Sequence, residues 1–126
     1  MALLAVIFSL DVSAQVTIAA RAAGSHIGQT VTICDKVYDG RTMPAESATV
    51  LYLGGYYPHQ LLTVIIKNAD RKKFKGRPEV DDKGKDFTVK GKLVNYEGKP
   101  AIVATSPAQL KPVLIDNSRQ PPIKLR

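Results

Sequence analysis

The stretch Lys85–Pro107, KDFTVKGKLVNYEGKPAIVATSP, decides the fold. Its first half alternates apolar and polar side chains, which is the pattern of a strand with one buried face and one wet face. Gly91 interrupts this strand and is typical of a bulge or sharp bend, which a small barrel needs in order to close. The turn residues Asn95–Gly98 and a second apolar run, Pro100–Thr105, complete a predicted β-hairpin.

Three further strands are predicted before this hairpin, over Gln29–Tyr38, Thr49–Leu53 and Leu61–Lys67. The last of them is apolar almost throughout, which favours a central, well-covered position. Residues 39–47 are polar and open on Asp-Gly, so we expect a loop there. Residues 68–85 are strongly charged, and we expect a short helix that begins near Asn68 and is followed by a loop.

The first predicted strand contains two unusual residues. Asp35 falls on the apolar face, where an unpaired carboxylate is costly, so we expect a bulge that turns it outward. The sequence of segment 32–37 aligns with that of segment 88–93, and Asp35 occupies the position that corresponds to Gly91. This match supports a bend at both positions. Cys34 is the only cysteine, so an intrachain disulfide is excluded, and its place in an apolar strand predicts an inert core thiol.

The length of 126 residues allows one domain. Residues 1–14 hold an unbroken apolar run followed by small residues, which predicts a signal peptide and a periplasmic or secreted location. A buried N-terminal strand or helix is the alternative, because no basic residue precedes the run. We expect the domain to span residues 15–110, with a short helix over Ile18–Ala23 at one end of the barrel. Residues 111–126 are expected to form an extended or disordered tail.

Five strands, with a short helix or loop between the third and fourth, are typical of the OB-fold, an all-β, five-stranded Greek-key barrel. The residues that carry the resemblance are His26–Cys34 with Lys36-Val37, Leu53-Gly54 with Tyr57-Pro58 and Gln60, Thr63–Ile66, and Gly91–Leu93 with Tyr96, Gly98–Pro100, Ile102 and Ser106-Pro107. They resemble the small OB-fold domains of bacterial exported proteins and, more distantly, the anticodon-binding type of OB-fold. That resemblance implies a binding module and supplies no catalytic residues. The family usually carries glycine where this chain has Asp35.

The charge distribution indicates an acidic ligand. The formal net charge is +7, and ten of the 18 basic side chains lie between Lys67 and Lys92. OB-folds bind ligands with aromatic platforms and a basic groove. The candidate ligand-binding residues are therefore Tyr52, Tyr56, Tyr57, Lys67, Arg71, Lys72, Lys73, Lys75 and Arg77. We expect them to bind single-stranded nucleic acid or another polyanion.

Other interpretations of these residues stay open. The cations could simply solvate the surface, and Tyr57-Pro58 could simply close a loop. The ligand would then be a protein, a glycan or a small molecule of the cell envelope, or the chain would be an accessory domain recruited by a partner.

Catalytic and metal-binding patterns are weak. His26 and His59 are the only imidazoles, and no metal-ligand spacing surrounds them, so we expect no metal and no cofactor. One secreted type of nuclease is built on an OB barrel, but the spacing of its acidic and arginine residues is not matched by Asp35, Asp39, Arg41 and Glu46. No nucleophile turn of the G-x-S-x-G type is present. We expect a protein that is neither an enzyme nor membrane-spanning.

Overall fold

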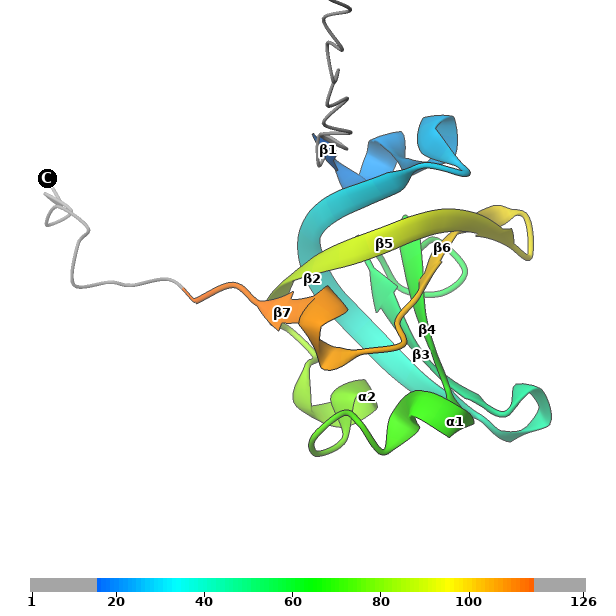
Figure 1. The fold of residues 1–126 in the computed structure, drawn as a ribbon, viewed down its shortest axis with the longest axis vertical. Helices are drawn as coiled ribbons and strands as arrows, with labels where there is room; N and C mark the ends of the chain where they lie inside the picture. The colour runs from blue at the N-terminus through cyan, green and yellow to red at the C-terminus, as the bar shows by residue number, and fades with distance from the viewer. Residues whose placement is uncertain (1–15, 115–126) are drawn as a thin grey trace, which may run out of the picture.

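The computed structural model of the chain describes residues 16–114 and shows a closed barrel of five strands (Figure 1). The strands follow one another around the barrel in the order β2-β3-β4-β6-β5, and β5 pairs back with β2. Only the β4–β6 pair among them is parallel. This is the OB-fold topology, so the predicted fold class is confirmed. The strands span Thr30–Met43 (β2), Ala48–Leu53 (β3), Leu62–Lys67 (β4), Asp86–Tyr96 (β5) and Lys99–Val103 (β6).

The barrel closes because its two long strands each change partner halfway along. β2 pairs with β5 as far as Lys36 and with β3 from Val37 onward. In the same way β5 pairs with β2 as far as Lys92 and with β6 from Leu93 onward. The two matched sequence segments, 32–37 and 88–93, are therefore equivalent in the structure, since each ends where its strand turns to a new neighbour.

Gly91 lies in β5 at a point where neighbouring side chains leave little room for a Cβ atom. A Cβ atom at this position would lie 2.6 Å from Cγ2 of Ile102 and 3.1 Å from Nε2 of Gln109. Atoms cannot approach so closely without a shift of the neighbouring side chains. The register between β2 and β5 runs through Gly91 without a bulge, so this glycine serves close packing against Ile102 and Gln109.

The bulge predicted at Asp35 is wrong. The register between β2 and β5 runs without interruption through Asp35, and the shift lies farther on, between Val37 and Asp39. Asp35 is only half-buried, and its Oδ1 accepts a hydrogen bond from the backbone N–H of Lys36 at 2.7 Å. Because the carboxylate keeps access to water and has a donor, the strand needs no bulge to accommodate it.

The barrel interior holds the apolar side chains that alternate along the strands. Val31, Ile33, Val89 and Leu93 are each at most 1% exposed. Burying one such side chain contributes about 1.5–3 kcal/mol. Leucine, isoleucine and valine side chains from β3, β4 and β6 extend this core, together with Val37, Phe74 and Phe87. The central position expected of the third strand is confirmed, because β4 lies between β3 and β6 with only Lys67 exposed.

Cys34 does not belong to this core, so its prediction as a core thiol is wrong. It is exposed on the outside of β2. The reason is the two-residue period of the strand, because Ile33 points inward and its neighbour must point outward.

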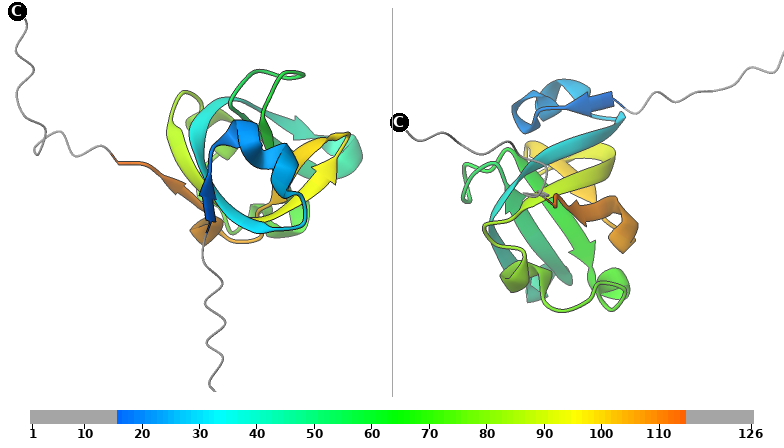
Figure 2. Two further views of the ribbon diagram at one scale, coloured as in Figure 1. Left: turned by 90° about the horizontal axis from the view of Figure 1, so that it is seen from above. Right: turned by 90° about the vertical axis from the view of Figure 1, so that its left-hand side faces the viewer.

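A short helix lies across one end of the barrel (Figure 2). It is the 3-10 helix η1, Ala20–His26, and it buries Ala20 and Ala23. The predicted N-terminal helix is thus confirmed, although it is a 3-10 helix, which is more tightly wound than an α-helix. Strand β1, Val16–Ile18, precedes it and pairs in parallel with β2. The signal peptide predicted for residues 1–14 lies outside the described residues.

Two single-turn helices cover the opposite end (Figure 1). They are α1, Asn68–Arg71, and α2, Pro78–Asp81. The helix expected after Asn68 is confirmed, but the loop expected after it is interrupted by α2, whose first position suits proline. Helix α2 packs closely on β2, since a Cβ atom at Gly40 would lie 2.5 Å from Cα of Glu79.

The loop expected over residues 39–47 is mostly strand. β2 continues to Met43 and pairs with β3 up to Met43↔Ala48. Only the 3-10 helix η2, Pro44–Glu46, and Ser47, with a φ of 51°, form the connection. Polar residues are tolerated in this part of β2 because its outer face meets water.

The chain stays in the sheet beyond residue 110, where we expected the domain to end. Ser106 caps the 3-10 helix η3, Pro107–Gln109, and strand β7, Leu110–Pro112, then pairs with β5. The remainder of the predicted tail, residues 115–126, lies outside the described residues.

Candidate binding site

A second apolar cluster lies on the outside of the barrel. The two-residue period of β3 sends Leu51 and Leu53 inward and leaves Val50 and Tyr52 on the outer face. Around these two residues the cluster holds Ala48, Ile65 and Ala101, with half-buried Met43, Val94, Tyr96 and Val103 at its margin. The five central residues are each at most 9% exposed, so other parts of the chain cover them, and only the half-buried margin of the cluster reaches the surface.

A groove of about 640 Å³ opens on this face; we call it the apolar groove. Its floor includes Ile65, Val94 and Val103, while Tyr96 and Lys67 stand in its wall. It lies between the turn that connects β2 to β3 and the turn that connects β5 to β6. Both turns project from the same side of the barrel (Figures 1 and 2).

A side-chain bridge joins the two turns. The hydroxyl of Tyr96, at the end of β5, donates a hydrogen bond to Oε2 of Glu46, in η2. This bond to the carboxylate raises the pKa of Tyr96, because loss of the phenolic proton would place two negative charges side by side. The bridge holds the Tyr96 ring in place as part of the groove wall.

Three residues stack beside the groove at the other end of β3. The rings of Tyr52 and Tyr57 lie 5.4 Å apart between centroids, and the Arg41 guanidinium lies 5.5 Å from the centroid of Tyr57. Tyr52 is 3% exposed whereas Tyr57 is 48% exposed. Burial raises the pKa of Tyr52 and outweighs the opposing effect of Arg41. Tyr52 therefore supports the stack, and Tyr57 presents it to solvent.

Tyr56 lies apart from this stack. Its ring meets the edge of Tyr38 at a centroid distance of 5.2 Å, and 63% of the residue is exposed. The loop of Tyr56 and Tyr57 is attached to the β5–β6 hairpin, because Nζ of Lys99 donates a hydrogen bond to the carbonyl oxygen of Pro58.

The predicted tyrosines and the predicted cations do not form one site. Leu53 pairs with Leu62 at one end of the β3–β4 ladder, and Ala48 pairs with Lys67 at the other. The rise of about 3.4 Å per residue separates these ends by about 17 Å. The tyrosine loop follows the first end, and α1 with the cationic segment follows the second. Lys67 alone among the cations lines the apolar groove.

Three of the predicted cations are engaged in ion pairs. Arg71 donates to the Glu79 carboxylate at 3.1 Å, and Lys73 donates to Asp70 at 2.8 Å. Arg77 lies 3.7 Å from Glu79. The Arg71–Glu79 pair connects α1 to α2, while the other two pairs are local to one helix each, so we assign all three to the stability of the insert. Lys72 and Lys75 are exposed.

The residues that invited comparison with a nuclease are dispersed. Arg41 stacks on Tyr57, Glu46 accepts from Tyr96, and Asp39 pairs with Lys83 at 3.1 Å. Burial opposes ionisation of Asp39, but hydrogen bonds from Lys83 and from the Gly40 N–H outweigh it and lower the pKa of Asp39. Residues 16–114 contain no group of three or more His, Cys, Asp or Glu side chains placed to hold a metal ion. Within the same residues, no helix has the length and apolar character to span a bilayer.

Arg41 and Tyr96 belong to the site but were missing from the sequence-based set. Arg41 fell in a segment expected to be a loop, and Tyr96 fell in the expected turn. One signal could have revealed Tyr96, since it continues the outward positions Thr88, Lys90, Lys92 and Val94 of the same strand. No comparable signal marks Arg41.

Comparison with known proteins adds to the evidence on the fold. No protein-family model matches the chain, and no curated protein matches it. The solved structures include a match described as "a putative aspartyl-tRNA synthetase from Leishmania major Friedlin", with a TM-score of 0.50 and 9% sequence identity. The match covers 82% of this chain and 22% of that one, so this chain spans about a fifth of its neighbour. These comparisons give no support to the narrower resemblance to exported bacterial domains. At this identity the likeness concerns the fold alone, and it agrees with the OB-fold barrel described above.

Proposed function

We propose that this chain is an OB-fold binding module for single-stranded nucleic acid. One observation carries the proposal, namely that an apolar groove containing Tyr96 and Lys67 lies between the two hairpin turns that flank the second and third barrel strands. OB-folds bind oligonucleotides and oligosaccharides at this place. The synthetase whose structure resembles this barrel is consistent with that choice of ligand.

The chemistry of the groove suits a nucleotide. Ile65, Val94 and Val103 offer an apolar surface to the face of a base, and Tyr96 adds an aromatic ring. The ammonium group of Lys67, at the wall of the groove, is placed to neutralise a phosphate. A groove that combines a stacking surface with a cation binds single strands with little sequence preference.

Tyr57 supplies a second platform for a neighbouring base. Its ring is half exposed, and Arg41 beside it carries a charge that can meet a phosphate or stack on a base. Together with Lys99 these residues continue the site from the apolar groove toward the loop between β3 and β4.

Fluorescence anisotropy with a labelled strand of about 5 nucleotides tests the proposal, since one OB-fold covers about 4–16 nucleotides. The Lys67→Glu variant should bind weakly, and its log affinity should depend less on log salt, by about 0.7 for the phosphate contact that is lost. Lys72→Glu is the matched control, because Lys72 is exposed but lies outside the groove. Equal effects of the two variants, or no binding by the unmodified protein, would refute the assignment.

A protein or glycan of the cell envelope is a second candidate ligand. The largely apolar floor of the groove favours it, because an apolar side chain of a partner fits there as well as a base. For such a ligand, Tyr57→Ala should weaken binding while added salt has little effect. The salt dependence therefore distinguishes the two candidates.

Export is part of the proposal as well. It depends on the apolar run within residues 1–14, and mass spectrometry of the protein isolated from cells tests it. A mature chain that begins at Gln15 would support cleavage of a signal peptide, and an intact N-terminus would contradict it.

A further inference from the structure

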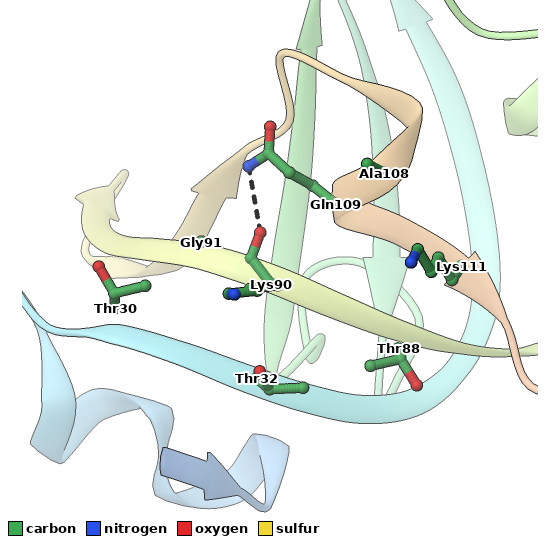
Figure 3. A pocket seen from close by; sticks show the side chains of 8 residues that line it. All are labelled: Thr30, Thr32, Thr88, Lys90, Gly91, Ala108, Gln109 and Lys111. Carbon is green, nitrogen blue, oxygen red and sulfur yellow. Dashed lines mark hydrogen bonds between the residues drawn. The ribbon is translucent and has the colours of Figure 1, made fainter. Parts of the chain in front are cut away.

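A second groove, of about 630 Å³, lies on the outer face of β2, β5 and β7 (Figure 3). Its lining consists mainly of threonine and lysine side chains, including Thr30 and Thr32 from β2, Thr88 and Lys90 from β5, and Lys111 from β7. Neither the apolar groove nor the tyrosine stack includes any of these residues. We call this surface the threonine–lysine face.

Strand pairing arranges this face in three successive rows, each with one lysine and at least one threonine. Thr88 pairs with Lys111, Thr32 pairs with Lys90, and Thr30 pairs with Lys92. Paired residues in a sheet point to the same side, so each lysine stands next to a hydroxyl group. The rows repeat every two residues along β5, which corresponds to about 6.8 Å.

The charge on this face is not neutralised by neighbouring acids. None of the salt bridges formed within residues 16–114 involves Lys90, Lys92 or Lys111. No carboxylate lines the groove. The next row, in which Lys36 pairs with Asp86, contains the first acidic residue and ends the series. The insert behaves differently, since there Arg71, Lys73 and Arg77 each have an acidic partner.

The hydroxyl groups on this face are also free to bind a ligand. In the described part of the chain, the side chains of Thr30, Thr32 and Thr88 make no hydrogen bond, whereas those of Thr63 and Thr105 do. The side chain of Gln109, which also lines the groove, does not bond to these hydroxyl groups. Its Nε2 donates a hydrogen bond to the backbone carbonyl oxygen of Lys90, at 3.1 Å, and so holds β5 against η3 (Figure 3). A cation beside a free hydroxyl, repeated at a regular step, is suited to a chain of regularly spaced oxyanions.

Strand β5 connects this face to the apolar groove. Its outward side chains are Thr88, Lys90 and Lys92 before β5 changes partner and Val94 and Tyr96 after it. Thr88 and Lys90 line the second groove, Lys92 extends the same side of the sheet beside Thr30, and Val94 and Tyr96 line the apolar groove. A single extended ligand can therefore follow one strand from one surface to the other.

We propose that a single strand of nucleic acid held in the apolar groove continues along β5 and that the three lysine–threonine rows bind its phosphates. This inference depends on the proposed function and extends it, because it gives the path of the strand beyond the groove. The bases that cross this face contact no aromatic ring, so its contribution to binding is independent of sequence.

Strands of two lengths test the path. The K90Q/K92Q/K111Q variant should bind a strand of about 5 nucleotides as the unmodified protein does, because that strand fills only the groove. For a strand of about 20 nucleotides, the slope of log affinity against log salt should become shallower by about 2, which is about 0.7 for each of the three phosphates. The K72Q/K75Q/K85Q variant removes the same charge from exposed positions at the insert and serves as the control.

A second variant examines the hydroxyl groups without changing charge. T32V/T88V preserves the β-branched shape of both side chains and should lower the affinity for the longer strand by about two- to tenfold for each hydroxyl, with an unchanged salt slope. Circular dichroism checks that both variants keep the fold.

The outcomes separate the two proposals. The path along β5 is wrong if the slope of log affinity against log salt for the longer strand is unchanged in the lysine variant. It is also wrong if the control variant shows an equally large decrease in that slope. In both cases the groove assignment stands. If the unmodified protein binds neither strand, both the proposed function and this path are wrong.

Discussion

The guanidinium group of Arg41 lies over the ring of Tyr57, 5.5 Å from its centroid, and joins the β2–β3 hairpin to the loop that follows β3. Each residue limits the freedom of the other, because the loop can move only by breaking this contact. The exposed ring of Tyr57 is thus held in place by a residue distant in sequence, and Tyr52 packs against it.

Removing the Tyr57 ring should weaken the binding of a single strand. A base stacked on an aromatic side chain contributes about 1–3 kcal/mol, so Tyr57→Ala should raise the Kd by about 5- to 150-fold. Tyr57→Phe keeps the ring and should leave the Kd within about twofold. Anisotropy titrations measure both, and similar losses in the two variants would show that the hydroxyl group, not the ring, matters.

The Arg71–Glu79 pair should stabilise the insert. Its side chains are 24% and 10% exposed, so Glu79→Gln leaves a largely buried guanidinium without its counter-charge. We expect the free energy of unfolding to fall by about 1–3 kcal/mol. Urea denaturation followed by circular dichroism measures this change.

Arg77→Ala provides the comparison for that experiment. The Arg77 side chain is 72% exposed and lies 3.7 Å from the same carboxylate. Such an exposed pair contributes about 0–1 kcal/mol, so this variant should be almost as stable as the unmodified protein. A loss as large as that of Glu79→Gln would contradict the structural role assigned to the buried pair.

Gly40 should tolerate no side chain. A Cβ atom there would lie 2.5 Å from Cα of Glu79 and 2.7 Å from its carbonyl oxygen, and backbone atoms cannot rotate away. Gly40→Ala should therefore cost about 1–3 kcal/mol of stability by pushing α2 off β2. Gly24→Ala is the matched control, because nothing lies within 4 Å of its Cβ position. Thermal unfolding of the two variants should show a lower Tm for the first alone.

Tyr96 should ionise at a higher pH than an ordinary tyrosine side chain. Its folded pKa is raised above the usual value of 10.0 by the Glu46 carboxylate. A raised pKa means that the folded state holds the proton more tightly, so this contribution to stability is complete below pH 10 and is lost as the pH rises through the folded pKa. Tyrosinate absorbance titrations check this, with Tyr96→Phe identifying the late step. In Glu46→Gln that step should move to lower pH, and an unmoved step would rule out the bridge.

The strand pattern illustrates how much of the fold is encoded locally. Each of the five strands was predicted from its own apolar residues. The internal match between 32–37 and 88–93 predicted bends at Asp35 and Gly91, whereas in the structure both segments end where a long strand changes partner. The bulge predicted at Asp35 was wrong. The sequence shows that this carboxylate lies on the inward side of a strand, but it does not show how exposed to water the carboxylate is in the folded barrel. Cys34 was assigned to the core because the apolar character of the strand was given more weight than its two-residue period.

The candidate site was only partly predictable. The tyrosines and the basic segment are close in sequence, and we expected them to act together. The β3–β4 ladder places them at opposite ends, and the ion pairs of α1 and α2 occupy three of the expected cations. Arg41 and Tyr96 joined the site only because the β2–β3 and β5–β6 hairpins project on the same side of the barrel.

The amino-acid sequence alone determined the class of fold, the order of the strands and the inward set of side chains, because the two-residue period of a strand is a local property that burial makes visible. The tertiary structure alone decided which side chains come together around the apolar groove. Closure of the barrel turns the outer faces of β3, β4, β5 and β6 toward a common groove, and the distances that matter there join residues far apart along the chain. Such distances depend on how the strands pair and curve, and the sequence of a single segment does not specify either property.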